Sequence, residues 1–527
     1  MKKSFMRKFL IIFFLVILSG TSFAQEKPAS GNIEAGKKVY IKRCEGCHGV
    51  QGGGDGFASD RFDPKPRDFI MGLYKYRTTP NGSLPTDADL IKVVTVGLPG
   101  TGMPSWSSIL SDVEIKDVVS YIKTFSNKFE RQKGAIPVVE IGNEIPSSKE
   151  SIEKGKALFK SLECFKCHGE EGRGNGPSAL TLADDKGDPI RPRNLTLNWH
   201  FRGGGDAKDI YMRVNTGLNG TPMPSFKDSL DNEKSWHLAN YIRSLSPDKR
   251  PEINSVIKSK KVLGNIPADP SDQFWQESGE SGGAEYWFPM VGQVIREPRH
   301  FTPTVRDIFV KSVYSDKEVA FLVRWNDPSQ SKDGEALPSA GGGGGDDLFG
   351  GEEAPVATAL DDAIAIQFPG QKLEGLKKPY FVMGDAKIGV NLWTWKAGRL
   401  TESNANGIDN KTDTERAQKS ESQALLGGGG YKGGQYSVVI KRSLITKDTE
   451  KDVQFEVGKF VPIAFYAWDG HNAEAKSKRA LSHWYFVLLE PPTPNDVYVK
   501  PPLVALGVFG FLLLLQRKLR KDKGEKS

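Results

Sequence analysis

Cysteine is scarce in this chain of 527 residues, which has only four. The four form two tight pairs, and a histidine directly follows each pair. Disulfide frameworks that staple exported domains use more cysteines, spread along the chain. The four cysteines therefore point to attachment of a cofactor.

Net charge is also scarce away from the two ends. The formal charge is +7, and the first eight residues and the tail after Leu515 each contribute +4. The segment between them thus carries about −1. Nucleic-acid-binding domains need a basic surface, so we expect no nucleic-acid partner.

Long apolar runs are confined to the two ends. Near the start, a basic stretch precedes apolar residues 9–18 and the small-x-small site Ser22-Phe23-Ala24. This order predicts a secretory signal peptide over residues 1–24, with an uncleaved anchor as the alternative. We expect the rest of the chain to be exported.

The second apolar run, Leu503–Leu515, is too short to span a membrane unaided. With Lys500 snorkelling toward the headgroups, residues 497–515 come near the roughly 20 that a spanning helix needs. We predict a transmembrane helix there, followed by a basic cytoplasmic tail at 516–527. The bulk of the chain would then lie at the periplasmic face. The alternative is a helix that lies in the membrane interface.

One motif occurs twice at an offset of 120 residues. Cys44-x-x-Cys47-His48 recurs as Cys164-x-x-Cys167-His168, and Met103 and Tyr121-Ile122 recur at the same offset. A constant offset at both ends of a unit is typical of two copies of one fold. We place the copies at residues 31–127 and 150–246.

The repeated motif has the chemistry of covalent haem attachment. Two thiols can bond to the haem vinyl groups from one helical turn, and the adjacent imidazole can reach the iron. We therefore predict two haem c groups, with His48 and His168 as iron ligands. The alternative is a redox or zinc-binding cysteine pair beside an incidental histidine.

A second axial ligand is available in each copy. Met103 and Met223 each follow the motif histidine by 55 residues and lie in loops rich in glycine and proline. Histidine–methionine ligation leaves no open position at iron, which favours electron transfer over substrate chemistry. The alternative is a methionine that fills the core.

The two copies resemble class I cytochrome c domains. The resemblance implies small all-α folds that each wrap one haem. It also implies basic contacts to the haem propionates, for which Arg67, Arg191 and Arg193 are candidates. Solvated loop arginines are the alternative. His200 and His237 have no counterpart in the first copy, and we interpret them as surface or packing residues.

The C-terminal half changes character. From about residue 272 to 491, short alternating runs rich in β-branched and aromatic residues predict an antiparallel β-sandwich. Two low-complexity stretches, Gly341–Gly345 and the polar region 401–434, are typical of long exposed loops.

Four short segments carry a second resemblance: Pro379–Asp385, Val390–Lys396, Ala467–Gly470 and Ser482–Tyr485. They resemble the b-haem domain of the γ subunits of ethylbenzene dehydrogenase-like molybdenum enzymes. The resemblance implies a β-sandwich that holds a noncovalent haem b through a methionine and a lysine. Trp393 and Trp395 are more consistent with core positions than with haem contacts.

Met383 is our candidate for the methionine ligand, with core packing as the alternative. Lys478 is our candidate for the lysine ligand. Lys476 and Arg479 are neighbouring basic residues that could take this position instead. The alternative is a lysine that is exposed to solvent and binds no iron. The histidines His471 and His483 are rival ligands.

Together these features predict an electron-transfer cytochrome subunit with no catalytic residues of its own. It would pass electrons between a molybdopterin oxidoreductase, of nitrite oxidoreductase or dimethyl sulfoxide reductase type, and the respiratory chain. The partners would be iron–sulfur and molybdopterin subunits. The alternatives are a stand-alone membrane-anchored dihaem carrier, a dihaem peroxidase with an open iron, and a ligand-binding β-sandwich with cytochromes attached.

Overall fold

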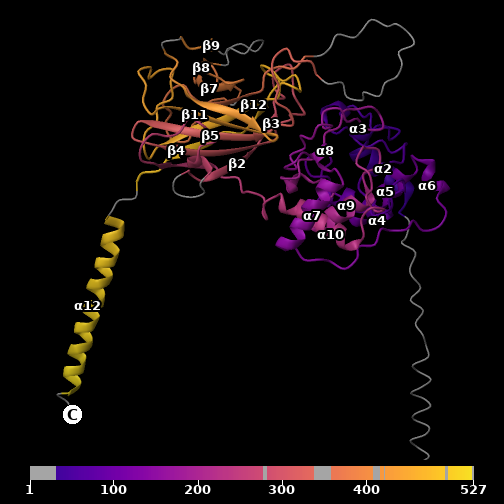
Figure 1. The fold of residues 1–527 in the computed structure, drawn as a ribbon, viewed down its shortest axis with the longest axis horizontal. Coiled ribbons are helices and arrows are strands. Elements are labelled where there is room, and N and C mark those ends of the chain that lie inside the picture. The colour runs from indigo at the N-terminus through magenta and orange to yellow at the C-terminus, as the bar shows by residue number, and fades with distance from the viewer. Residues whose placement is uncertain are drawn as a thin grey trace, which may run out of the picture. The chain divides into compact units, whose positions relative to one another are not determined.

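A computed structural model describes residues 31–276, 282–337, 358–380, 382–406, 416–419, 422–492 and 496–524 (Figure 1). The predicted signal peptide and the Gly341–Gly345 run lie outside the described residues. The chain divides into two compact units. One comprises the chain up to Glu140 with Thr216–Asn219, and the other comprises Ile141–Asn215 and the chain from Gly220 onward.

The first copy is built around a crossing of its first and last long helices, α2 and α5. A Cβ atom on Gly36 of α2 would lie 2.0 Å from the carbonyl oxygen of Asp117 in α5, so only glycine permits this approach. Tyr40 is fully buried beside the crossing and packs on the ring of Tyr121. The elements are α2 (Ile33–Arg43), α3 (Glu45–His48), η1 (Ser59–Arg61), α4 (Asp87–Val96), α5 (Asp112–Lys123) and α6 (Asn127–Arg131).

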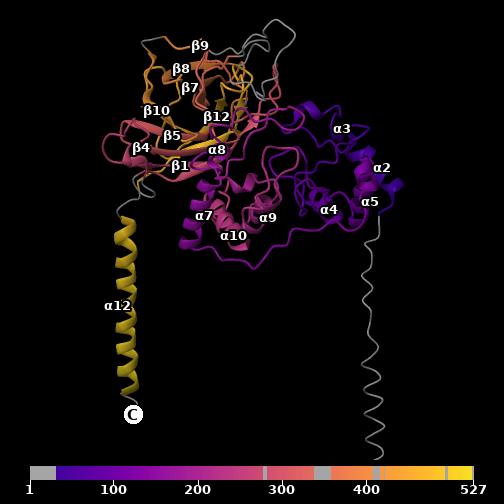
Figure 2. The ribbon, with the colours of Figure 1, turned by 45° about the vertical axis from the view of Figure 1, so that its right-hand side comes forward.

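The second copy repeats this crossing with α7 and α10, which lie side by side (Figure 1, Figure 2). A Cβ atom on Gly155 would lie 2.0 Å from the carbonyl oxygen of His237. His237 is buried, and its Nδ1 lies 2.9 Å from Ser151 Oγ, which makes it a packing residue as predicted. The elements are α7 (Lys149–Ser161), α8 (Phe165–His168), η2 (Asn198–His200), α9 (Ala207–Thr216) and α10 (Asn232–Ser244).

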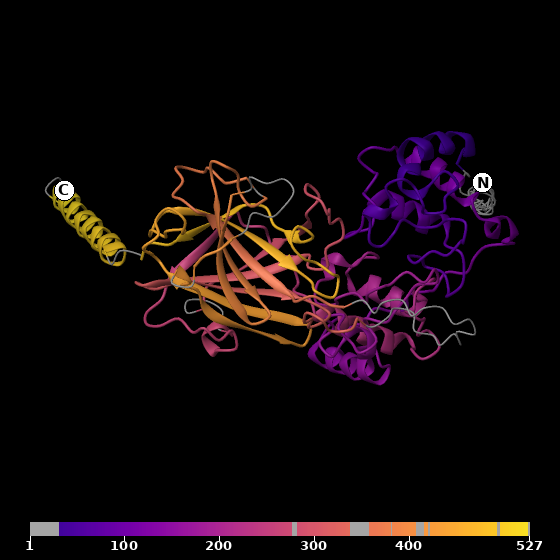
Figure 3. The same ribbon diagram turned by 90° about the horizontal axis from the view of Figure 1, so that it is seen from above.

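The C-terminal half forms a large sheet region, whose strands fan out across the domain in Figure 3. The hydrogen-bonded order is β10-β11-β5-β4-β1-β14-β12-β6-β7-β8-β9. The pairs are antiparallel, except that β1 runs parallel to both β4 and β14. The strands are β1 (Val256–Lys261), β2 (Glu285–Pro289), β3 (Val291–Gly292), β4 (Asp307–Tyr314), β5 (Glu318–Asn326), β6 (Ala363–Pro369), β7 (Val390–Lys396), β8 (Arg399–Ala405), β9 (Arg416–Ala417), β10 (Leu426–Lys432), β11 (Gln435–Ser443), β12 (Phe460–Trp468), β13 (Ala480–Leu481) and β14 (Tyr485–Leu489), with a short helix α11 (Gln273–Gln276) before β2.

Two features of this sheet differ from the sequence-based expectations. Strand β1 precedes the expected start of the domain at residue 272. Within the region 401–434, residues 401–405 lie in strand β8, and the glycine run 427–430 lies in strand β10, paired with β11, so the expectation of one long loop there was wrong. Glycine suits this strand because a Cβ atom on Gly429 would lie 2.7 Å from the Trp395 ring.

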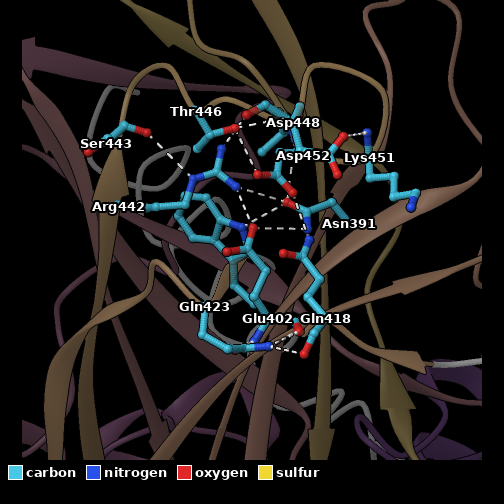
Figure 4. A network of polar contacts seen from close by, with 12 residues as sticks. Asn391, Glu402, Gln418, Gln423, Arg442, Ser443, Thr446, Asp448, Lys451 and Asp452 are labelled. Atoms are coloured by element: carbon cyan, nitrogen blue, oxygen red, sulfur yellow. Dashed lines mark hydrogen bonds and ion pairs between the residues drawn. The ribbon is translucent and has the colours of Figure 1, made fainter. Parts of the chain in front are cut away.

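A buried ion pair lies within the apolar core of the β domain (Figure 4). Arg442 and Glu402, both fully buried, bond to each other, and Asn391 Nδ2 donates to Glu402 Oε1 at 3.0 Å. The Arg442 guanidinium also lies 4.8 Å from the centre of the Trp393 ring and donates to the Val453 carbonyl. The two charges thus balance each other, and Glu402 Oε1 is hydrogen-bonded, whereas Glu402 Oε2 has no hydrogen-bond partner among the described residues.

The described chain ends in helix α12 (Asp496–Gly524). Within it, Pro501–Leu519 is long and apolar enough to cross a membrane, with a mean hydropathy of 1.6. This window begins four residues later than the predicted span at 497–515. Length and composition alone support the assignment.

Candidate haem sites

The first motif lies where α2 ends. Cys44 caps α2, and the short helix α3 holds the rest of the motif, with His48 N bonded to the Cys44 carbonyl at 2.9 Å. The second motif has the same hydrogen bond, from His168 N to the Cys164 carbonyl at 2.9 Å. Both motifs therefore present two thiols and one imidazole from a single helical turn, as covalent haem attachment requires.

The two motif histidines share one orientation. His48 Nδ1 lies 3.0 Å from the carbonyl oxygen of Arg67, and His168 Nδ1 lies 2.9 Å from that of Arg193. A carbonyl oxygen only accepts, so Nδ1 carries the proton and Nε2 keeps its lone pair for a metal. Burial lowers the pKa of both histidines, which favours the neutral form that ligates iron.

A glycine-rich loop after each motif brings the arginine carbonyl to the histidine. A Cβ atom on Gly54 would lie 2.5 Å from the Pro66 carbonyl oxygen, and one on Gly174 would lie 2.8 Å from that of Pro192. Both glycines have positive φ, +77° and +80°, which other residues rarely adopt. The sequence analysis assigned Arg67 and Arg193 to haem propionates and missed the role of their backbone. Propionate contacts by these arginines and by Arg191 stay predictions.

The predicted methionine ligands lie half-buried in equivalent loops. The Met103 amide donates to Thr101 Oγ1 at 3.0 Å, and the Met223 amide donates to Thr221 Oγ1 at 3.2 Å. Met103 packs against the core of the first copy, which includes Phe69. Phe69 in turn stacks on the His48 ring at 4.5 Å. The structure thus places Met103 and His48 around one apolar cluster.

Several buried donors in the two copies have no partner in the described structure. They include Tyr74 OH and Trp106 Nε1 in the first copy, and Trp199 Nε1 and Arg202 Nε in the second. A buried donor without an acceptor costs about 1–3 kcal/mol. Haem propionates are acceptors that could satisfy such donors, so these residues fit a bound haem.

The first cysteine of each motif is a buried thiol with a raised pKa. Burial is the main reason that the pKa of Cys44 is raised to about 12 and that of Cys164 to about 11. Thiols with such pKa values are protonated at neutral pH as long as nothing is bound to them. Conversion to thioethers removes this ionisation altogether.

In the β domain, Met383 lies in a buried cluster of mostly small apolar residues. It is 1% exposed and has a left-handed φ of +57°, and its amide donates to Tyr466 OH at 3.1 Å. The cluster also contains Ala363, Ala365, Val390, Leu392, Ala405, Trp468 and Leu481. A left-handed methionine is uncommon, which marks this position as one with a special backbone requirement.

The basic residues considered for the lysine ligand differ in burial and in their hydrogen bonds. Lys478 is half-buried, and its Nζ donates to the Asn472 carbonyl at 2.7 Å, whereas Lys476 is exposed. Arg479 is fully buried, with its guanidinium 4.3 Å from the centre of the Tyr466 ring. The burial of Met383 agrees equally with a ligand and with core packing, so its role stays a prediction, and Lys478 would have to release Asn472 before it could act as a ligand.

The rival histidines differ in burial. His471 is half-buried, and burial lowers its pKa to about 4, so this imidazole is neutral at physiological pH. His483 is exposed. Of the two, only His471 is therefore shielded from solvent as an iron ligand would be.

Within the larger unit, the second copy contacts the β domain through two aromatic side chains. His200 Nε2 lies 2.8 Å from Asp307 Oδ2, and the Trp199 ring centre lies 6.0 Å from that of Trp287. Trp287 Nε1 also donates to Asp307, at 2.7 Å. His200, interpreted above as a surface or packing residue, thus packs at a contact between two domains. In the sequence, the adjacent aromatic residues Trp199 and His200 were the only sign of this contact between domains.

Three family models match separate parts of the chain. Residues 31–122 match the model of cytochrome c oxidase, cbb3-type, subunit III, and residues 152–246 match that of cytochrome c. Residues 287–425 match the model of ethylbenzene dehydrogenase. Both resemblances inferred from the sequence are thereby confirmed.

Curated relatives and solved structures add to these matches. A putative respiratory nitrate reductase heme subunit from Haloferax mediterranei is 26% identical over 31% of this chain and 57% of its own length. The chlorate reductase subunit gamma from Ideonella dechloratans is 29% identical over 24% of this chain and 48% of its own. The chain thus spans less than two thirds of either relative. A chain of the reducing HAO-like protein complex from Kuenenia stuttgartiensis is 45% identical over 41% of this chain and 98% of its own, with a TM-score of 0.40.

Proposed function

Because the chain joins two cytochrome c domains to an ethylbenzene dehydrogenase γ-like domain, we propose that it is the electron-transfer subunit of a molybdopterin oxidoreductase. It would pass electrons between an iron–sulfur subunit of that enzyme and the respiratory chain. The bound haems, two covalent haem c and one noncovalent haem b, supply one-electron chemistry. The chain itself would catalyse no substrate reaction.

The observation that carries this proposal is the matched construction of the two c-type sites. In each, a backbone carbonyl fixes the histidine with Nε2 available, and a half-buried methionine lies in a glycine- and proline-rich loop. With both ligands bound, neither site has an open position for peroxide or another substrate. This favours an electron carrier over a dihaem peroxidase.

The contact through His200 and Trp199 supports transfer between the second copy and the β domain. It holds the two domains together by a hydrogen bond and an aromatic pair. We propose that electrons from the partner enzyme enter at the β domain, next to Met383, and leave through the cytochrome copies or take the reverse direction.

The apolar segment of α12 supports a membrane anchor. We propose that this helix spans the cytoplasmic membrane with the basic tail on the cytoplasmic side. The haem domains would then lie at the periplasmic face, where cytochrome c domains mature.

Purification of the complex from native membranes tests this proposal. The full chain, tagged and extracted in mild detergent, should carry near-stoichiometric molybdenum and iron–sulfur iron, and substrate for the partner should reduce its haems. A chain with all its haems but without molybdenum, under conditions that preserve other respiratory complexes, would contradict the proposal. That result would favour a stand-alone carrier.

A further inference from the structure

Three buried aspartates meet where strands of the β domain begin or end. Asp327 follows β5, Asp362 precedes β6, and Asp469 follows β12. They are 0%, 1% and 2% exposed, and one carboxylate oxygen from each lies within 4.8 Å of the other two. No part of the proposed electron-transfer function uses this group.

The main charges that act on Asp327 are those of other carboxylates, namely Asp469, Asp362 and Glu474. The lysines and arginines in ion pairs here contact other acids, such as Lys396 with Asp361 and Arg442 with Glu402. The nearby Glu474 is also buried and pairs with His300 at 2.8 Å. Carboxylates are rarely buried without a counter-charge.

Neutral donors hold the carboxylates in place without neutralising them. Asp362 accepts from Ser331 N at 2.6 Å, from Tyr436 OH at 2.7 Å and from Gly470 N at 2.8 Å. Asp469 Oδ1 accepts from His471 N at 2.8 Å, and Asp327 Oδ1 accepts from Ser329 N at 3.1 Å. The donors thus hold the three side chains in fixed positions.

The second oxygen of Asp327 is the independent sign of a ligand. Asp327 Oδ2 is buried and has no hydrogen-bond partner in the described structure. A buried carboxylate oxygen without a donor is strongly unfavourable unless a proton or a cation satisfies it.

We propose that Asp327, Asp362 and Asp469 bind one calcium ion, which ties the ends of β5, β6 and β12 together. The donors are all oxygen, which suits a hard cation and not a softer transition metal. Calcium binds oxygens at about 2.3–2.6 Å, so oxygens on opposite sides of the ion lie about 5 Å apart. One oxygen from each aspartate could therefore reach the same ion, because these oxygens all lie within 4.8 Å of one another. Magnesium needs shorter bonds and keeps several waters, which suits a buried cluster less well.

Calcium titration of the full, haem-loaded chain in detergent tests the site. After chelator treatment and removal of the chelator, the wild-type chain should take up about one calcium per chain, measured by calorimetry and elemental analysis. Its β domain should melt at a higher temperature with calcium than with the same concentration of magnesium. The substitution D327N should weaken calcium binding at least about tenfold. D316N, which changes an exposed aspartate paired with Lys261, should leave it unchanged.

The wild-type titration decides the question even if D327N does not fold. The proposal is overturned if the wild-type chain binds no calcium at millimolar concentration and its melting temperature does not respond. It is also overturned if folded D327N binds calcium as tightly as the wild-type chain. Haem content and molybdenum copurification are measured separately, so failure here leaves the electron-transfer proposal untouched.

Discussion

The cytochrome copies and the β domain differ in how far apart in the sequence their predicted cofactor-binding residues lie. In each copy, three attachment residues lie within five consecutive positions, and a local hydrogen bond fixes the histidine. In the β domain, Met383 lies between strands, and the candidate lysines come from a distant segment after β12. The first kind of site is encoded locally, and the second exists only once the sheet has formed.

The hydrophobic cores of the cytochrome copies and of the β domain also differ. The copies are small helical domains, each with one modest apolar cluster, whereas the β domain has a much larger main cluster that includes Trp325, Trp393 and Phe368. Small domains bury a smaller fraction of their surface, so a bound group contributes more to their stability. We infer that haem completes the fold of the cytochrome copies and that the β domain folds without it.

The largest effect is expected from removal of one covalent attachment site. The double substitution C164S/C167S should reduce the covalent haem count from two to one and unfold the second copy, because its core would lack the bound group. Haemochrome spectra and circular dichroism measure both effects. K166A, at the exposed position inside the same motif, is the control and should keep both haems. Retention of two covalent haems by the double variant would contradict the assignment.

The next effect concerns the buried ion pair of the β domain. R442M should lower the free energy of unfolding by about 3–5 kcal/mol, because it leaves Glu402 buried without its partner. The double variant E402Q/R442M should recover much of this loss. Urea unfolding followed by tryptophan fluorescence measures both, with haem content as a check. A loss below about 1 kcal/mol for R442M would mean that water reaches Glu402.

Exchange of an axial methionine should alter redox behaviour without unfolding the domain. M103H should lower the reduction potential of the first c haem by about 0.1–0.3 V, because methionine ligation raises the potential. M290L, which changes a methionine in the β-domain core, is the matched control and should leave all c-haem potentials in place. An unchanged potential in M103H would remove Met103 from the ligand set.

The smallest structural effect is expected at Met383. M383L conserves volume and should change the stability of the β domain by less than about 1.5 kcal/mol. It should nevertheless abolish the extractable haem, because leucine cannot ligate iron. Extraction of the purified variant measures the noncovalent haem, and its two covalent haems serve as the internal reference. A variant that retains the extractable haem would make Met383 a core residue only.

The sequence predicts the locally encoded features well. The repeat, its helices and the Cys-x-x-Cys-His turns follow from residues close together in the chain, and the family matches confirm the domain types. The role of the Arg67 carbonyl escaped prediction, because a backbone atom leaves no signature in residue identity.

In the β domain, prediction was weaker because the contacts are distant in sequence. Strand β1 joins the sheet in parallel, and the glycine run forms β10, since Trp395 from another strand occupies the space beside it. The three clustered aspartates come from segments far apart, and each alone is an ordinary strand-end residue. Periodicity identifies strands but does not indicate which strand ends meet.

A count of covalent and extractable haem in the purified full chain tests the central claim most directly. Pyridine haemochrome spectra before and after acid–acetone extraction separate the two kinds. The account predicts two covalent haems and one extractable haem b per chain. Two covalent haems with none extractable, after haem loss during purification is excluded, would contradict the b-haem site and leave a dihaem carrier attached to a docking domain.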